Sequence, residues 1–78
     1  MIYYDKKKAG ERIKFVRKEM SLTQEELAER LVYGSARQLR RIENGETVCS
    51  VDRLMEIAQI LGVSTDYILF GTKDGNRG

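Results

Sequence analysis

Apolar side chains recur along the chain at the spacing of short amphipathic helices. From about Asp5 to Glu19 they follow the i, i+4, i+7, i+11 pattern of one helix face, which consists of Ala9, Ile13, Val16 and Met20. We therefore expect a first helix over this segment, with that face buried. Gly10 lies inside the segment and lowers its helix propensity slightly.

Capping residues divide the rest of the chain into four further helices. Thr23 is followed three residues later by Glu26, the capping-box pattern in which each side chain binds a backbone N–H at the helix start. Serines precede the other three segments, and Gly45 and Gly62, residues that favour helix ends, follow the first two of these. The expected helices run from about Gln24 to Leu31, Ala36 to Asn44, Val51 to Leu61 and Thr65 to Phe70.

For two groups of apolar residues, the sequence pattern does not determine whether they lie in the core or in a subunit contact. The fourth expected helix has a main inward stripe made of Val51, Leu54, Met55, Ala58 and Leu61. Ile57 and Ile60 lie outside that stripe, so this helix is either the central helix of the bundle or part of a subunit contact. A small domain cannot enclose every aromatic ring, so a second group either packs in the core or forms a dimer patch: Phe15, Tyr67, Ile68 and Phe70.

Length and composition favour one compact all-α domain. The chain has 78 residues, of which 41% are hydrophobic and 33% charged, as suits short helices around a single core. It contains no recognisable signal peptide and no apolar run near the roughly 20 residues of a membrane span, so we expect a cytoplasmic protein without a membrane partner. Cys49 is the single cysteine and histidine is absent, so we expect no metal, no cofactor and no enzymatic activity.

Basic residues are concentrated near the start of the chain. Residues 1–19 hold seven Lys or Arg against three acids, a net charge of +4, whereas residues 44–78 hold three against five, a net charge of −2. The run Lys6–Lys8 makes segment 1–8 either a basic arm that follows a phosphate backbone or the solvated start of the first helix. We expect the main domain over residues 9–71 and a flexible tail over residues 72–78, which lack large apolar side chains.

The third expected helix carries the candidate chemistry. If Leu39 and Ile42 face inward, a step of about 100° per residue places a polar face opposite them, made of Arg37, Arg40, Arg41 and Asn44. The planar fork of arginine can donate two hydrogen bonds to guanine O6 and N7 in the major groove of DNA. On periodicity alone, a charged face that contacts only water is an equally good interpretation.

Several motifs in a fixed order resemble one family. They are Gly10-Glu11-Arg12-Ile13, Leu22-Thr23-Gln24-Glu25-Glu26-Leu27-Ala28-Glu29, Arg41-Ile42-Glu43-Asn44-Gly45 and Leu61-Gly62-Val63-Ser64. Over about residues 9 to 71 the sequence is similar to the phage-repressor, Cro-like helix-turn-helix family, also called the XRE family. The resemblance implies a compact five-helix, lambda-repressor-like DNA-binding domain whose third helix lies in the major groove.

The resemblance also implies roles for individual residues. The family's base-reading positions fall on Ala36, Arg37 and Arg41, and of these Ala36 offers only a methyl contact to thymine. The expected phosphate contacts are Thr23, Gln24, Ser35, Arg40 and Asn44. At Gln24, both the side-chain amide and the positive end of the helix dipole favour an anion. Arg17 and Glu43 match a family pair that ties the first helix to the end of the third, so we expect a structural ion pair.

Three features depart from the family pattern. The turn Val32–Ser35 is one residue longer than usual, which leaves the angle of the third helix open. Glu46 and Thr47 stand where many relatives have basic residues, so we expect weaker attraction of phosphate in that loop and repulsion by Glu46. Cys49 replaces a frequent proline, a change with little bearing on function.

Two functions of different classes follow from these patterns. The first is a sequence-specific transcription regulator, a repressor, which binds double-stranded DNA as a homodimer on an operator with two half-sites. The second is an antitoxin or adaptor, in which the same fold serves mainly to bind another protein.

Overall fold

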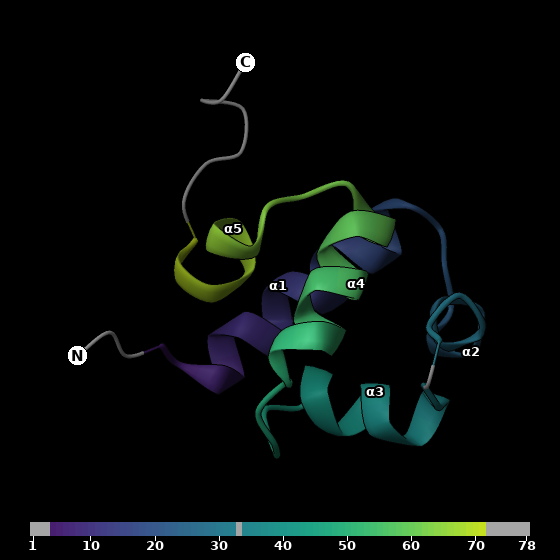
Figure 1. Cartoon of the computed structure of the whole chain (residues 1–78), viewed down its shortest axis with the longest axis horizontal. Coiled ribbons are helices and arrows are strands. Elements are labelled where there is room, and N and C mark those ends of the chain that lie inside the picture. Colours follow the sequence, from purple (N-terminus) through teal and green to yellow (C-terminus); the bar gives the residue numbers. More distant parts are fainter. Residues whose placement is uncertain (1–3, 33, 72–78) are drawn as a thin grey trace.

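The chain folds into five helices without a strand over residues 4–32 and 34–71, the ranges that the computed structural model describes. The helices are α1 (Lys6–Glu19), α2 (Gln24–Glu29), α3 (Ala36–Glu43), α4 (Val51–Leu61) and α5 (Thr65–Phe70). Figure 1 shows α3 along one edge of the molecule, with one side turned away from the other helices. The predicted all-α, five-helix fold is confirmed.

The helices begin behind the expected caps. The side chains of Asp5, Thr23, Ser35, Ser50 and Ser64 each accept a hydrogen bond from a backbone N–H in the first turn. The prediction for the second helix was too long, because α2 ends at Glu29 rather than near Leu31. The N–H groups of Arg30 and Leu31 bond to carbonyls three residues back instead of four, which tightens and ends the helix.

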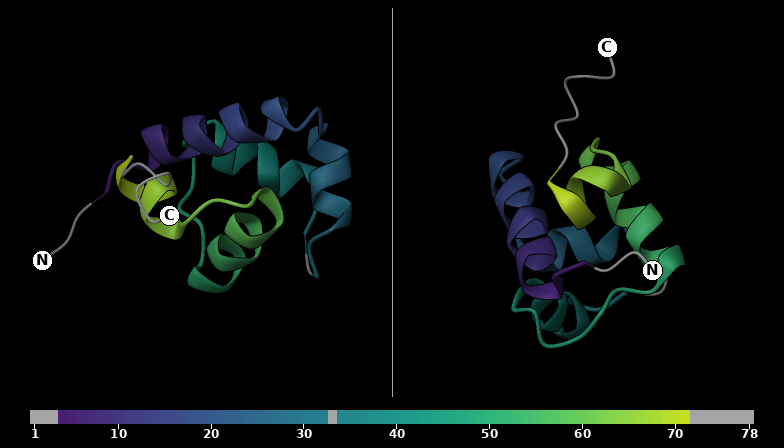
Figure 2. Two further views of the ribbon diagram at one scale, coloured as in Figure 1. Left: turned by 90° about the horizontal axis from the view of Figure 1, so that it is seen from above. Right: turned by 90° about the vertical axis from the view of Figure 1, so that its left-hand side faces the viewer.

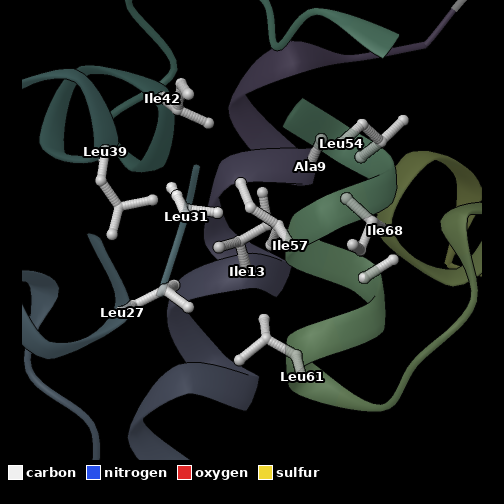
Figure 3. Close-up of a cluster of buried hydrophobic side chains, with 11 residues drawn as sticks. Ala9, Ile13, Leu27, Leu31, Leu39, Ile42, Leu54, Ile57, Leu61 and Ile68 are labelled. Carbon is white, nitrogen blue, oxygen red and sulfur yellow. The ribbon is translucent and has the colours of Figure 1, made fainter. Parts of the chain in front are cut away.

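One hydrophobic core joins all five helices. Figure 3 shows Ile13 of α1 and Ile57 of α4 at its centre, with Leu27 and Leu39 approaching from α2 and α3. Ile68 contributes from α5, and each of these five side chains is at most 1% exposed. Burial of a large aliphatic side chain contributes about 1.5–3 kcal/mol, so these central residues supply much of the stability of the domain.

Three apolar residues that the sequence placed inward are exposed: Val51 is 70% exposed, Met55 58% and Met20 42%. Phe70, whose environment the sequence left open, is 43% exposed. On α4, Leu54, Ala58 and Leu61 are buried as predicted, and Ile57 completes the buried side, because α1 and α5 pack against that side. Met20 is the C-cap residue of α1. The chain then turns toward α2 at Ser21, which has a left-handed conformation.

Helix α1 packs against most of the other helices. It packs against α3 and α5, and α2 packs against α3; Figure 2 shows α2 near one end of α1 and α5 near the other. The α1–α3 contact depends on Gly10, where a Cβ atom would lie 2.3 Å from the carbonyl oxygen of Ile42. Gly10 lowers the helix propensity of α1 slightly, but its lack of a side chain allows α3 to pack closely against α1.

Candidate nucleic-acid interface

The outer face of α3 is strongly basic. Its inner face is fixed by Leu39 and Ile42, which are 1% and 6% exposed. The opposite face carries the exposed side chains Arg37, Arg40, Arg41 and Asn44, while Ala36 at the helix start is half-buried. The structure therefore brings together on one side of α3 the arginines and the asparagine that the sequence pattern grouped.

A buried carboxylate fastens α3 to the two helices before it. Glu43 accepts hydrogen bonds from Arg17 Nε at 2.7 Å and Arg17 Nη2 at 3.0 Å, in a bidentate ion pair. The side chain of Arg17 is 7% exposed and that of Glu43 is 0% exposed. Arg17 Nη1 also donates to the carbonyl oxygen of Leu22 at 2.6 Å, so the same guanidinium holds the turn after α1.

Gln24 is part of the same network. Its Nε2 donates to Glu43 Oε1 at 2.9 Å, and the side chain is half-buried at the start of α2. An amide nitrogen has two hydrogens, so one remains for an external acceptor such as a phosphate oxygen. Glu43 thus fixes the orientation of the side chain that the sequence assigns to a phosphate.

The capping hydroxyls at the starts of α2 and α3 keep a donor. Thr23 Oγ1 accepts from the N–H of Glu26 at 3.0 Å, and the Glu26 carboxylate accepts from the N–H of Thr23 at 2.8 Å, which completes the predicted capping box. Ser35 Oγ accepts from the N–H of Gln38 at 3.2 Å. A hydroxyl that accepts one hydrogen bond can still donate its proton, so both residues can bind a phosphate without loss of the cap.

Helix α4 supports the helix-turn-helix through two polar contacts that no sequence pattern predicted. Glu56 Oε2 accepts from the backbone N–H of Val32 at 2.7 Å, at the end of α2. One turn earlier on α4, Arg53 Nη1 donates to the side-chain oxygen of Gln38 on α3. Of the longer turn Val32–Ser35, Tyr33 lies outside the described residues. The contacts join residues 24 and 15 positions apart, which no local pattern indicates.

The loop after α3 places an acid beside the basic face. Glu46 Oε1 lies 3.6 Å from Arg41 Nε, and Asn44 Nδ2 donates to Glu46 Oε2 at 3.5 Å. This contact involves two of the residues that the sequence assigns to DNA. Glu46, which departs from the family pattern, therefore lies directly against Arg41 and Asn44.

The basic run Lys6–Lys8 forms the first turn of α1. Asp5 Oδ1 accepts from the N–H groups of Lys7 and Lys8 at 2.9 and 3.3 Å, and the three lysine side chains are exposed. The backbone of Lys7 lies against Gly45, where an added Cβ atom would be 2.7 Å from the Lys7 Cα. The start of α1 is thus next to the loop that follows α3.

Cys49 has the environment of an unreactive thiol. It is half-buried between α3 and α4. Desolvation on burial raises the pKa of its thiol from 9.0 to about 11, although the nearby charge of Arg53 opposes the shift. Within the described ranges, no cluster of three or more acidic, cysteine or histidine side chains is placed to hold a metal ion, and no helix there is long and apolar enough to cross a membrane.

Comparison with known proteins identifies the family of this chain. The helix-turn-helix family profile matches residues 13–68. Among solved structures, the chain is similar to the apo form of the competence regulator ComR from Streptococcus vestibularis, with a TM-score of 0.77 and 37% sequence identity over 87% of this chain and 23% of ComR. The chain thus spans about a quarter of the length of that protein. It belongs to the helix-turn-helix family, and the predicted XRE-family resemblance is confirmed.

Proposed function

We propose that this chain is a sequence-specific, non-catalytic DNA-binding regulator that acts as a repressor, with α3 in the major groove of its operator. The observation that carries the proposal is the basic outer face of α3, held rigidly from behind by the buried Arg17–Glu43 pair. A rigid helix with exposed arginines can present several donors to base edges at the same time.

Base recognition is assigned to the start and middle of α3. Arg37 and Arg41 are exposed and one helical turn apart, so both can reach neighbouring base pairs when the helix lies in the groove. Each donates in bidentate fashion to guanine O6 and N7, a contact that discriminates by about 1–3 kcal/mol. Ala36, half-buried at the start of α3, contributes a methyl contact.

Phosphate contacts surround this base-reading face. Gln24 contributes its remaining amide hydrogen, and Thr23 and Ser35 contribute hydroxyl protons at the starts of α2 and α3. Arg40 and Asn44 extend the contact along the outer side of α3. These contacts fix the register of the domain on the duplex and carry no sequence information themselves.

The proposed active form is a homodimer on an inverted repeat. One α3 has eight residues and reads only a few base pairs, so two copies are needed for a selective site, with half-sites about 34–36 Å apart. Occupation of a promoter is sufficient for repression, whereas activation requires a further contact with the transcription machinery. Repression is therefore the simpler outcome of this binding mode.

The test is selection of bound sequences from random duplex DNA, followed by titration of the best sequence at several salt concentrations. We expect an inverted repeat with half-sites one helical turn apart and an affinity that falls steeply with salt. The matched control is Arg37→Ala, an exposed substitution that leaves the core untouched and should weaken preference at one position. Selection that returns no motif with the folded protein would refute operator recognition.

A second candidate function, an antitoxin or adaptor that binds another protein, is favoured by the outer face of α4. Val51 and Met55 lie one turn apart there and are 70% and 58% exposed, and Val48 in the preceding loop is 59% exposed. Exposed apolar side chains in a row are typical of a protein contact. If DNA selection fails, a complex with a partner that is lost on Met55→Glu would support this second function.

A further inference from the structure

The end of α3 forms a Schellman motif that brings two charged side chains together. The N–H of Glu46 donates to the carbonyl oxygen of Arg41 at 2.9 Å, and the N–H of Gly45 donates to that of Ile42 at 3.1 Å. Gly45 supplies the left-handed residue, with φ 78°. In this motif the positions of Arg41 and Glu46 commonly form an apolar contact. Here the backbone places a carboxylate beside a guanidinium instead.

The Glu46 carboxylate therefore faces two side chains of the proposed DNA interface. One oxygen lies 3.6 Å from Arg41 Nε and the other 3.5 Å from Asn44 Nδ2. The side chains of Arg41 and Glu46 are 56% and 55% exposed, so water and DNA can compete for both partners. The contact is an exchangeable one and contributes little to the stability of the fold.

Base and phosphate contacts of Arg41 respond differently to this carboxylate. Glu46 approaches the guanidinium at Nε, so the terminal groups Nη1 and Nη2 remain available for a bidentate contact with guanine. A phosphate at Arg41, in contrast, brings a second anion close to Glu46, and the two like charges repel. That penalty applies wherever Arg41 binds a phosphate, whatever the DNA sequence, because every duplex has the same backbone. It is absent where Arg41 binds a base.

We propose that Glu46 is a specificity-determining residue, which orients Arg41 toward a base and disfavours its contact with phosphate. The inference rests on the proposed DNA-binding function and adds to it the residue that limits non-specific binding. Because the cap hydrogen bonds of Glu46 use its backbone N–H, the side chain can be changed without loss of the turn.

The experiment compares the wild-type chain with Glu46→Gln on two duplexes, the selected operator and a scrambled sequence of equal length, over a range of salt concentrations. We expect Glu46→Gln to raise affinity for the scrambled duplex about threefold to tenfold, by the size of one screened charge interaction, and affinity for the operator by less than about twofold. The salt slope on the scrambled duplex should steepen by about 0.9, the value for one further neutralised phosphate.

The matched control is Asp66→Asn, which removes one exposed acid from α5, a helix that carries none of the proposed DNA contacts. It should change neither affinity. In an Arg41→Ala background, Glu46→Gln should raise both affinities equally, because only Arg41 carries the difference. Thermal melting should show all variants folded.

Two results would overturn the inference, and they are distinguishable. If the wild-type chain selects an operator but Glu46→Gln leaves the ratio of the two affinities unchanged, Glu46 has no role in specificity and the proposed function stands. If the folded wild-type chain binds no duplex selectively, the proposed function fails and the role of Glu46 fails with it.

Discussion

Arg17 and Glu43 form an ion pair inside the domain, and replacement of Arg17 by methionine would leave a buried carboxylate with one remaining hydrogen bond, from Gln24. The guanidinium makes two contacts with Glu43 and one with the Leu22 carbonyl, and all three are lost in the variant. The side chain of Glu43 is 0% exposed, so water cannot replace these partners without a rearrangement of the core.

The expected cost is large relative to the stability of the domain. Removal of one partner of a buried pair costs about 3–5 kcal/mol. A chain of 78 residues has a total stability on the order of 4–12 kcal/mol, so Arg17→Met should remove about a quarter of it or more. Even a loss of about 3 kcal/mol lowers Tm by about 12–24 °C in a domain of this size.

Urea and thermal unfolding, followed by far-UV circular dichroism, measure this loss. The double variant Arg17→Met with Glu43→Leu should regain most of the stability, because an apolar pair of similar volume leaves no charge unpaired. The control is Glu46→Gln, which breaks an exposed pair with Arg41 and should cost less than about 1 kcal/mol. The reasoning is wrong if Arg17→Met costs no more than this control, or if the double variant is as unstable as the single one.

Three further predictions concern packing, DNA recognition and thiol chemistry. Gly10→Ala should destabilise the domain by about 1–3 kcal/mol or prevent folding, because the new methyl would lie 2.3 Å from the Ile42 carbonyl oxygen; an unchanged Tm would show that α1 and α3 separate freely. Arg37→Ala should cost about 1–3 kcal/mol in operator affinity and relax preference at one position, whereas Gln24→Ala should weaken all sequences alike, and equal loss of preference in both would contradict the assigned register. Because burial raises the pKa of the Cys49 thiol from 9.0 to about 11, iodoacetamide at pH 8–9 should react more slowly with the folded than with the urea-unfolded chain. The same shift stabilises the fold below pH 9 and loses this contribution as pH rises toward 11, so equal alkylation rates would refute it.

Local signals predicted the helices well because caps act within one turn. Thr23 with Glu26, and Ser35 with the N–H of Gln38, satisfy backbone groups three residues away. Such pairs are visible in the sequence without knowledge of the fold. The basic face of α3 was predictable for the same reason, since Leu39 and Ile42 alone determine which side of the helix faces solvent.

The buried side of α4 could not be chosen from its sequence. Apolar residues occur nearly all round this helix, so two stripes compete. Leu54, Ala58 and Leu61 of the predicted stripe are buried, but Val51 and Met55 are exposed and Ile57 is 0% exposed, because α1 and α5 approach from the side of Ile57. The positions of those helices are a tertiary property, and periodicity within α4 contains no information about them.

Of the contacts that orient the interface, one follows from a local sequence rule and two do not. The Glu46–Arg41 pair follows from a rule about helix ends, because Asn44-Gly45 places the next residue over the side chain five positions earlier. The contacts of Glu56 and Arg53 with the helix-turn-helix have no such local cause. They join segments that meet only after the whole bundle has formed.

Recognition and stability are combined in Glu43, although they are separate elsewhere in the domain. Arg37 and Arg40 are exposed and make no contact with the core, so their substitution should change DNA binding with little effect on folding. Glu43 differs because one of its oxygens binds both Arg17 and Gln24, at 3.0 and 2.9 Å. The same carboxylate thus holds α1 against α3 and orients a proposed phosphate contact. An apolar replacement of the ion pair can restore the first role but not the second, which gives a physical reason to retain a charged pair in a core that would fold without one.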